Sequence, residues 1–379
     1  MSRTFLCLMA LATLSWLSCG HAAVLPEDRA DALYHRYDGG GVTIDGPSLL
    51  VRKQVAKNVS VAANYYVDSI SSASIDVVTT ASAYSEKRTE MSVGADYLYN
   101  STIFSTGYKN SDESDYTANS AYFGVSQDLF GALTNISMSY ARGWDEVSRT
   151  GDSEFSEDVE RHSYRLGISQ ILTRNLLMGM TLETITDEGF LNNPYRSVRY
   201  LDPDSERGYS YQAEIYPNTR TSTAVSVRGR YRLPYRAALH SEYRFFDDTW
   251  GIAAHTGELG YTQPVWGRWM LDLSYRYYTQ TAADFYSDLF SREDAQNYMA
   301  RDKELSDFDS HTLGIGVSYE ILPEGWRFFE KGNLSVRYNY IYFDYENFRD
   351  LRDDGNAPGT EPQYSFSANV VQFFFSVWF

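Results

Sequence analysis

The chain has 379 residues, with 33 basic and 50 acidic side chains and a formal net charge of −17 at pH 7. This acidity argues against nucleic acid as a partner, because a polyanion would be repelled. Hydrophobic residues make up 43% of the chain, which excludes a disordered protein, and aromatic residues make up 16%, including 32 tyrosines. Such a composition is unusual for a cytosolic enzyme and typical of a bacterial outer-membrane β-barrel.

The N-terminus has the features of a secretory signal. Arg3 provides a short positive region, residues 5–17 are apolar, and small residues follow at the expected cleavage site. We therefore predict a signal peptide over residues 1–22 and a mature domain over residues 23–379. A lipoprotein acylated at Cys19 is the alternative, which the bulky residues before that cysteine disfavour. Both cysteines of the chain lie in the predicted signal, so the mature protein has no thiol or disulfide chemistry.

Apolar and polar residues alternate along the chain from about residue 30. The clearest examples lie in residues 59–68, 91–99, 136–140, 313–319, 334–342 and 371–379. This period of two predicts strands with one apolar and one polar face. A soluble β-sandwich would show the same alternation. Small residues on the polar face, aromatic residues at the ends of the apolar segments and a chain that ends on Phe379 favour a membrane barrel.

Short turns and long loops should alternate in such a barrel, with the turns on the periplasmic side. Candidate turns lie near residues 56–58, 100–101, 130–131, 174–175, 234–235, 266–267 and 323–325, the last continuing to about 332. Phe379 must face the periplasm, so the last strand runs toward the periplasm. Counting back through the turns, the strand before residue 56 runs in the same direction, and another strand must rise ahead of it. Residues 31–37, joined through the turn at 38–41, provide that strand. The sequence predicts an all-β fold, a single transmembrane antiparallel β-barrel of about 16 strands, with a range of 14–18 because residues 186–220 could hide a hairpin. A barrel of this width can enclose an aqueous channel unless something fills it.

The predicted outer loops are long and acidic. They span residues 147–160, 282–308 and 347–361. The simplest interpretation is a solvated surface. The alternative is a Ca²⁺ or Mg²⁺ site that bridges to lipopolysaccharide, because oxygen ligands suit these ions. Its candidate ligands are Asp350, Asp353, Asp354 and Asn356, although their spacing does not match an EF-hand loop.

One predicted loop, residues 69–86, is unlike the others because it is built of small, weakly charged and β-branched residues. We expect it to fold inward as a constriction. The candidate residues of this constriction are Asp68, Ser71, Ser72, Ser74 and Asp76. A β-hairpin that extends above the membrane is the alternative.

Several charged residues fall on the polar, lumen-facing side of the predicted strands. They are Arg165, Glu183, Arg228, Arg230, Arg232, Glu242, Arg244, Arg276 and Arg337. The turns place Arg165 opposite Glu183 and Arg228 opposite Glu242, and such cross-strand pairs stabilise a sheet. The same charges could instead select permeant ions. The run from Arg228 to Arg232 has more positive charge than its neighbours neutralise, so a local anion-attracting patch is a further hypothesis.

No catalytic motif supports an enzyme. None of the mature histidines lies in a Gly-x-Ser-x-Gly or His-Glu-x-x-His context. His240 would face the lumen while Ser241 points to the opposite face, so no triad forms there. We therefore predict that the protein is not an enzyme and holds no cofactor, with a barrel-borne hydrolase as the least favoured alternative.

Residues 37–41, 46–48 and 64–88 resemble the N-terminal signature of a family of proteobacterial exported proteins described only as a domain of unknown function. The run from Asp68 to Val78 is its most specific part. The resemblance implies an outer-membrane-type barrel and no known activity. Family members tend to be encoded beside a small lipoprotein, a thioredoxin-like protein and a flavin transferase. This neighbourhood implies a link to envelope redox or metal handling, with the lipoprotein or the thioredoxin-like protein as a partner.

The leading functional prediction is a porin-like channel or conduit for a small solute. Its location would be the outer membrane of a Gram-negative bacterium, reached after signal-peptide cleavage. Outer-membrane lipid, lipopolysaccharide and the barrel assembly machinery would be its partners. The main alternative is a plugged, structural barrel that acts as a scaffold for envelope proteins.

Overall fold

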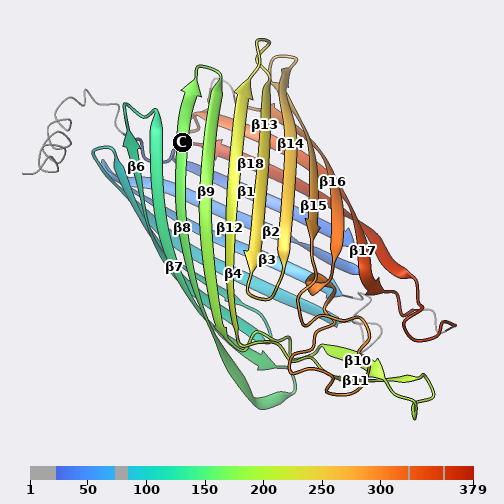
Figure 1. The fold of residues 1–379 in the computed structure, drawn as a ribbon. Coiled ribbons are helices and arrows are strands. Elements are labelled where there is room, and N and C mark those ends of the chain that lie inside the picture. Colours follow the sequence, from blue (N-terminus) through green and yellow to red (C-terminus); the bar gives the residue numbers. More distant parts are fainter. Residues whose placement is uncertain (1–22, 73–83, 323–324, 353–354) are drawn as a thin grey trace, which may run out of the picture.

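The computed structural model describes residues 23–72, 84–322, 325–352 and 355–379. They form one closed antiparallel β-barrel of 16 strands and a separate two-stranded hairpin (Figure 1). The prediction of an all-β barrel with about 16 strands is confirmed. The predicted signal peptide lies outside the described residues. Among those described, no helix is both long and apolar enough to cross a membrane.

The strands of the barrel follow one another around the wall in chain order. They are β1 (Arg29–Gly39), β2 (Val42–Ala56), β3 (Val59–Ser72), β4 (Tyr84–Tyr99), β5 (Thr102–Asp112), β6 (Tyr116–Leu129), β7 (Thr134–Arg149), β8 (Asp152–Thr173), β9 (Leu176–Gly189), β12 (Thr219–Arg232), β13 (Ala238–Asp248), β14 (Ala253–Val265), β15 (Trp269–Gln280), β16 (Phe308–Glu320), β17 (Lys331–Arg349) and β18 (Gln363–Trp378). The separate hairpin is formed by β10 (Ser197–Leu201) and β11 (Tyr209–Ala213).

Pairing of the first strand with the last closes the barrel. The register of β1 with β18 runs without a shift from Arg29 opposite Trp378 to Gly39 opposite Ala368. Strand β1 also pairs with β2 along its full length. No barrel strand therefore keeps a free edge, which satisfies the requirement that backbone groups in a membrane pair within the protein.

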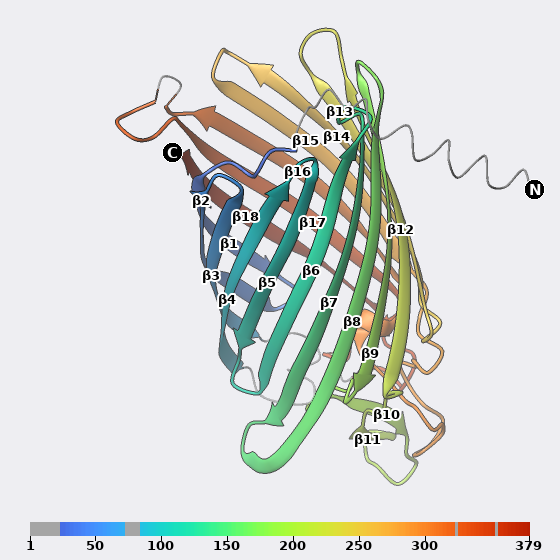
Figure 2. The same ribbon diagram turned by 90° about the vertical axis from the view of Figure 1, so that its left-hand side faces the viewer.

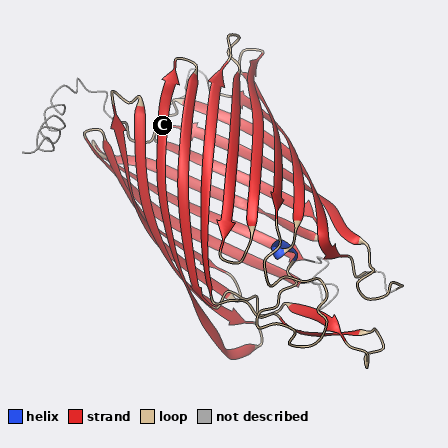
Figure 3. Cartoon of the chain, viewed as in Figure 1, coloured by secondary structure: helices blue, strands red, loops and turns tan. Residues whose placement is uncertain are grey.

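The two ends of the barrel differ. One end, here called the turn end, holds the C-terminus and six of the predicted short turns; the seventh includes residues 323–324, which lie outside the described chain (Figure 1). A typical turn joins β14 to β15 through Trp266 (φ 44°) and Gly267 (φ 72°), a left-handed pair that matches the twist of a tight hairpin. The other end, the loop end, holds the long connections, which Figure 3 shows as extended loops around the small hairpin and a single helical turn, η2 (Lys303–Leu305).

Two predicted connections differ from expectation. Residues 186–220 do contain a hairpin, but β10 and β11 pair only with each other and stay outside the barrel sheet. Residues 147–160, predicted as an acidic loop, belong almost entirely to strands, because β7 ends at Arg149 and β8 begins at Asp152. Figure 2 shows these two strands extending past their neighbours at the loop end. Alternating polar residues continue the cross-strand ladder there, so the acidity marks a solvated strand extension.

The outer face of the barrel wall is apolar and the inner face is polar. On β16, Leu313, Ile315 and Val317 point outward and are 60%, 45% and 37% exposed, whereas Gly314 and Gly316 face the lumen. Because these apolar side chains cover no protein core, the wall is built to face lipid. The packed apolar core lies instead among the connections at the loop end.

Candidate functional site

The inner wall brings together oppositely charged side chains from neighbouring strands. Arg165 on β8 donates to Glu183 on β9 at 2.6 Å, and the register places these residues directly opposite each other. The Arg228 guanidinium lies 2.9 Å from the Glu242 carboxylate across β12 and β13. Arg244 reaches the second oxygen of Glu183 at 4.0 Å. These contacts tie adjacent strands together along the water-facing side of the sheet.

Four other arginines that were singled out in the sequence lie on the same inner wall. They are Arg230, Arg232, Arg276 and Arg337. Within the described chain, none of these four has a carboxylate oxygen within 4.0 Å. Arg337 makes one long contact, 3.4 Å, with the Ser274 hydroxyl. Their guanidinium groups therefore remain available in the lumen.

A recess of about 580 Å³ opens in this wall between β12 and β18. Its charged lining comes from Arg228, Arg230, Glu242, Glu258, Asp272 and Arg337. Gly316 lies between Asp272 and Arg337 in the register, and its missing side chain leaves the floor of the recess open. His240 folds over Gly260, where a Cβ atom would come within 1.9 Å of its ring. Glycines on the inner face thus create the hollow that the arginines line.

The predicted constriction is only partly described. Asp68, Ser71 and Ser72 belong to β3 and to the barrel wall: Ser71 and Ser72 pair with both β2 and β4, and Asp68 pairs with Arg88 of β4. These three residues therefore do not form an inward-folded loop, because the ladder of β3 continues four residues further than the sequence suggested. Ser74 and Asp76 lie outside the described residues.

Asp68 is held against the wall by its neighbours. Its carboxylate lies 2.8 Å from Nε2 of His35 on β1, and the same nitrogen is 3.2 Å from the Tyr66 hydroxyl. This contact spans β2, where Gly46 allows close approach because a Cβ atom there would come within 1.8 Å of the Val67 carbonyl oxygen. The polar cluster stabilises the wall near the loop end.

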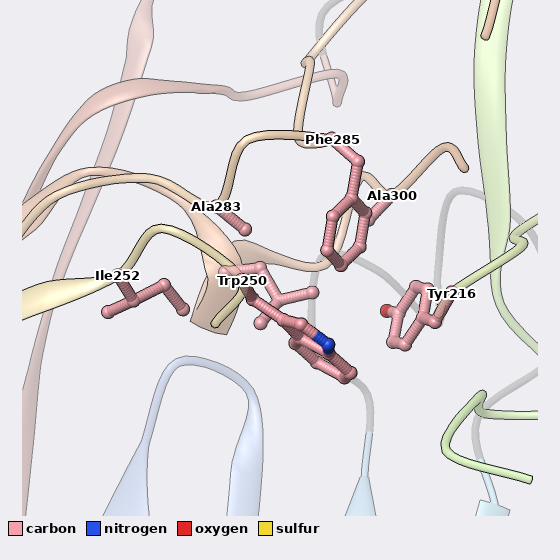
Figure 4. Packing of buried hydrophobic residues seen from close by; sticks show 7 residues of the cluster. Tyr216, Trp250, Ile252, Ala283, Phe285 and Ala300 are labelled. Atoms are coloured by element: carbon pink, nitrogen blue, oxygen red, sulfur yellow. The ribbon is translucent and has the colours of Figure 1, made fainter. Parts of the chain in front are cut away.

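At the loop end, three long connections and one short turn pack into a structure that we call the loop layer. It consists of the described residues in 190–218, 249–252, 281–307 and 350–362. Its apolar centre brings Tyr216, Trp250 and Phe285 into edge contacts, with ring centroids 5.2–5.6 Å apart (Figure 4). The Trp250 indole also donates to the Thr219 carbonyl at 2.9 Å. Aromatic burial of this kind makes the loop layer a folded unit.

A buried ion cluster joins the same connections. Arg199 on β10 is fully buried, donates to Glu361 at 2.5 and 3.1 Å, and pairs with the Asp288 carboxylate. Arg301 reaches the second oxygen of Asp288 at 3.0 Å and stacks over Phe348. Burial alone would raise the pKa of Glu361, but the Arg199 guanidinium lowers it below its usual value. The cluster fixes the hairpin against the connections at 281–307 and 350–362.

Glu214 is a second buried acid in the loop layer. Burial, together with the nearby Asp302 carboxylate, raises its pKa to about 7. The Tyr216 hydroxyl donates to Glu214 at 2.5 Å, and the Arg301 amide donates at 2.6 Å. Arg196 forms an ion pair with Asp302, and its charge lowers the pKa of Glu214 by less than burial raises it. The loop layer therefore contains a carboxyl group that titrates near neutral pH.

The loop layer also lines the lumen. A cavity of about 390 Å³ has lumen-wall arginines on one side and Tyr216, Asp302 and Leu305 of the loop layer on the other. The wall residues in this cavity are Arg161, Arg220 and Arg244. A solute that enters from the loop end would pass this boundary.

Of the predicted cation site, only Asp350 and Asn356 lie in the described residues. Asp350 accepts a bidentate contact from Arg352, which lowers the pKa of Asp350. Asn356 is exposed, and Asp353 and Asp354 lie outside the described residues. A carboxylate already neutralised by a guanidinium is a poor metal ligand. Among the described residues, the acids that do converge are Glu86, Glu113 and Asp115, at the start of β4 and in the connection after β5.

A family model matches residues 152–376, which is more than half of the chain, and its description is "Protein of unknown function (DUF3570)". The chain belongs to this family. The resemblance to a family of unknown function that the sequence showed is thus confirmed. A comparison of this DUF3570 protein with curated proteins gave no match.

Solved structures share the fold of this DUF3570 protein at low identity. A bacterial polysaccharide outer membrane secretin aligns with 9% identity and a TM-score of 0.51, over 94% of this chain and 100% of its own. The siderophore receptor PirA from Pseudomonas aeruginosa gives 11% identity and a TM-score of 0.45, over 93% of this chain and 63% of its own. The outer membrane protein OmpT of Vibrio cholerae gives 11% and 0.44, over 92% and 99%. At these identities the likeness concerns the fold of bacterial outer-membrane proteins.

Sequence reasoning missed the loop layer of this DUF3570 protein. Its buried residues, such as Arg199, Glu214 and Trp250, are separated by up to 162 positions from their partners, so no local pattern indicates their contacts. One signal was present. Aromatic residues are frequent in the connections, and Trp250, Phe285 and Phe290 are more apolar than solvated loops require.

Proposed function

We propose that this protein is an integral outer-membrane channel for small solutes, with the turn end in the periplasm and the loop layer at the cell surface. The observation that supports this function most directly is the inner wall. Around the barrel it presents Arg, Glu, Asp, Ser and Gly side chains, whereas the outer wall presents Leu, Ile, Val and Tyr. A 16-strand barrel with a charged inner face is built to hold water.

The loop layer supports a second candidate function. It is a packed structure that reaches the lumen, so a barrel closed at its outer end could act as a scaffold for envelope partners. Lipopolysaccharide, the barrel assembly machinery and a small lipoprotein or thioredoxin-like protein are the partners that we propose. We also propose a link to envelope redox or metal handling, which rests on the gene neighbourhood of the family. The solute that the channel carries would then belong to that process.

We also propose that the protein is not an enzyme. Three of the mature histidines, His162, His255 and His311, are hydrogen-bonded through Nδ1 to a tyrosine hydroxyl at 2.8 Å. All three lie on the outward-facing side of the wall. His240 lies on the lumen side, 3.7 Å from Glu258, and the neighbouring Ser241 faces away from it. None of these four histidines is thus placed beside a serine nucleophile on the same face.

Single-channel recording in a planar bilayer tests the channel. We expect stepwise, ohmic conductance from the purified wild-type protein. Trp250→Ala, which removes the centre of the loop layer, should raise the conductance if the loop layer narrows the outer mouth. A silent wild type that becomes conductive on this substitution would favour the scaffold with a closed end. Silence in both proteins would contradict the channel.

A further inference from the structure

Cations on the inner wall divide into two groups by their surroundings. From β1 to β9, each described cation that faces the lumen has a carboxylate within 4.0 Å. The pairs are Arg29–Asp31, Arg52–Asp96, Arg88–Glu90, Lys109–Glu90, Arg161–Asp187 and Arg165–Glu183. From β12 to β17, Arg230, Arg232, Arg276 and Arg337 have no such partner in the described chain. We call these four residues the arginine arc.

The arginine arc occupies one side of the lumen. Strands β12 to β17 are consecutive around the barrel, so the four side chains lie on one arc of the wall. Arg232 is the last residue of β12, while Arg276 and Arg337 come seven and six residues after the starts of β15 and β17 at the turn end. With about 3.3 Å per residue, all four lie within roughly 25 Å of the turn end. Arg230, Arg232 and Arg337 therefore lie in the half of the wall nearer the turn end, while Arg276, directly opposite Glu258 in the register, lies nearer the loop end.

The recess in the same wall gives the arc a site of defined chemistry. In it, Arg228 is neutralised by Glu242, and Glu258 lies near His240. Asp272 accepts a hydrogen bond from Thr262 at 2.5 Å. Arg230 and Arg337 remain, and each offers a planar guanidinium without a carboxylate within 4.0 Å in the described chain, Arg337 making one long contact with the Ser274 hydroxyl. Such a group binds carboxylate or phosphate oxygens through two parallel hydrogen bonds.

We propose that the arginine arc binds small oxyanions, carboxylates or phosphate, and makes the lumen selective for anions. This inference rests on the proposed channel function and names its substrate class. It follows from position as well as from charge. The protein as a whole is strongly acidic, so anion selectivity can arise only where basic side chains are gathered without neutralising partners. Because these arginines follow one another along the wall, an anion could bind to them in turn on its way from the recess to the turn end.

A reversal-potential measurement across a KCl gradient tests the selectivity. We expect the wild type to prefer chloride, and R230Q/R337Q to lower the ratio of chloride to potassium permeability by about twofold or more, as expected for the loss of unit charges at roughly 8 Å in water. The matched control is R174Q/R236Q, which removes the same charge from exposed turns at the same end of the barrel. A wild type that prefers potassium, or equal effects of the two double variants, would contradict the proposal that the arginine arc makes the channel selective for anions.

A second measurement separates the arc from the channel function. Inorganic phosphate is titrated into the detergent-solubilised, folded protein, and the ³¹P line width is recorded. We expect saturable broadening in the wild type and R174Q/R236Q and its loss in R230Q/R337Q. Equal broadening in all three proteins, or none in the wild type, contradicts oxyanion binding by the arginine arc even if the channel conducts. A silent bilayer with arginine-dependent phosphate binding would instead contradict the proposed channel and keep the anion site.

Discussion

A single buried side chain, Arg199, shows how the loop layer is held together. Its guanidinium is fully buried and satisfies two carboxylates that come from connections far apart in the chain. Burying a charge is costly, and the cost is recovered only if every donor finds a partner. Here the Asp288 carbonyl, the Asp288 carboxylate and both Glu361 oxygens provide those partners. The residue acts as a three-way clamp.

Replacing Arg199 tests the clamp. In Arg199→Met, Asp288 and Glu361 lose their shared cation, and we expect the loop layer to lose about 3–5 kcal/mol of stability while the barrel stays folded. Hydrogen exchange measured by mass spectrometry should show lower protection in residues 281–307. The control Arg352→Met removes an exposed ion pair and should change protection by less than about 1 kcal/mol. Unchanged exchange in Arg199→Met would show that the clamp adds no stability.

At the scale of elements, the loop layer behaves as a folded unit whose stability depends on pH. Glu214 is the reason. Its pKa rises from 4.5 in the unfolded chain to about 7 in the folded protein, mainly because of burial. A group with a raised folded pKa favours the folded state while it is protonated. Its contribution is therefore complete below pH 4.5 and is lost as the pH rises through 7.

Glu214→Gln tests this dependence. We expect wild-type protection in residues 281–307 to fall between pH 5 and pH 8, by about 3 kcal/mol as an order of magnitude, after correction for intrinsic exchange. The glutamine variant keeps the shape and cannot ionise, so its protection should be flat over this range. Glu206→Gln, at an exposed position in the hairpin, is the control and should retain the wild-type slope. An identical slope in Glu214→Gln would assign the pH dependence to another group.

At the scale of the whole molecule, the barrel is a closed ring of paired strands, because β1 pairs with β18. Each strand lies between two neighbours, so a missing backbone donor anywhere in the wall leaves a carbonyl without a partner. In lipid this cost is larger than in water, since no solvent replaces the lost bond. Closure also explains why the first strand, β1, is required, although its sequence signal is short.

A proline in the last strand should prevent closure. Val371 lies opposite Arg36 of β1 and Tyr338 of β17, in the middle of β18. Val371→Pro removes a ladder donor at a cost of about 3 kcal/mol or more, and we expect loss of the compact, fast-migrating form on unheated SDS gels. Asn356→Pro, in an exposed connection, should migrate like the wild type. A compact Val371→Pro protein would show that closure tolerates a gap at this position.

The sequence by itself determined the class of fold, the strand number and the positions of the short turns. The reason is that a membrane barrel is specified locally. Each strand must alternate in polarity, each turn needs residues such as Trp266 and Gly267 with left-handed backbone angles, and each lumen charge follows from counting every second residue. The same counting places Arg165 beside Glu183, as the structure has it, because register propagates from the turn.

Only the tertiary structure decided how the loop end is built and which lumen charges are left without partners. Arg199 meets Glu361 across 162 positions, and Glu214 meets the Arg301 amide across 87, so neither contact follows from a periodic pattern. The surroundings of the arginine arc also depend on the tertiary structure. Arg337 on β17 makes its printed side-chain contact with Ser274 on β15, 63 positions away and across β16, which no count from a turn predicts. Local periodicity determines the direction of a side chain, and packing between distant segments determines what it meets.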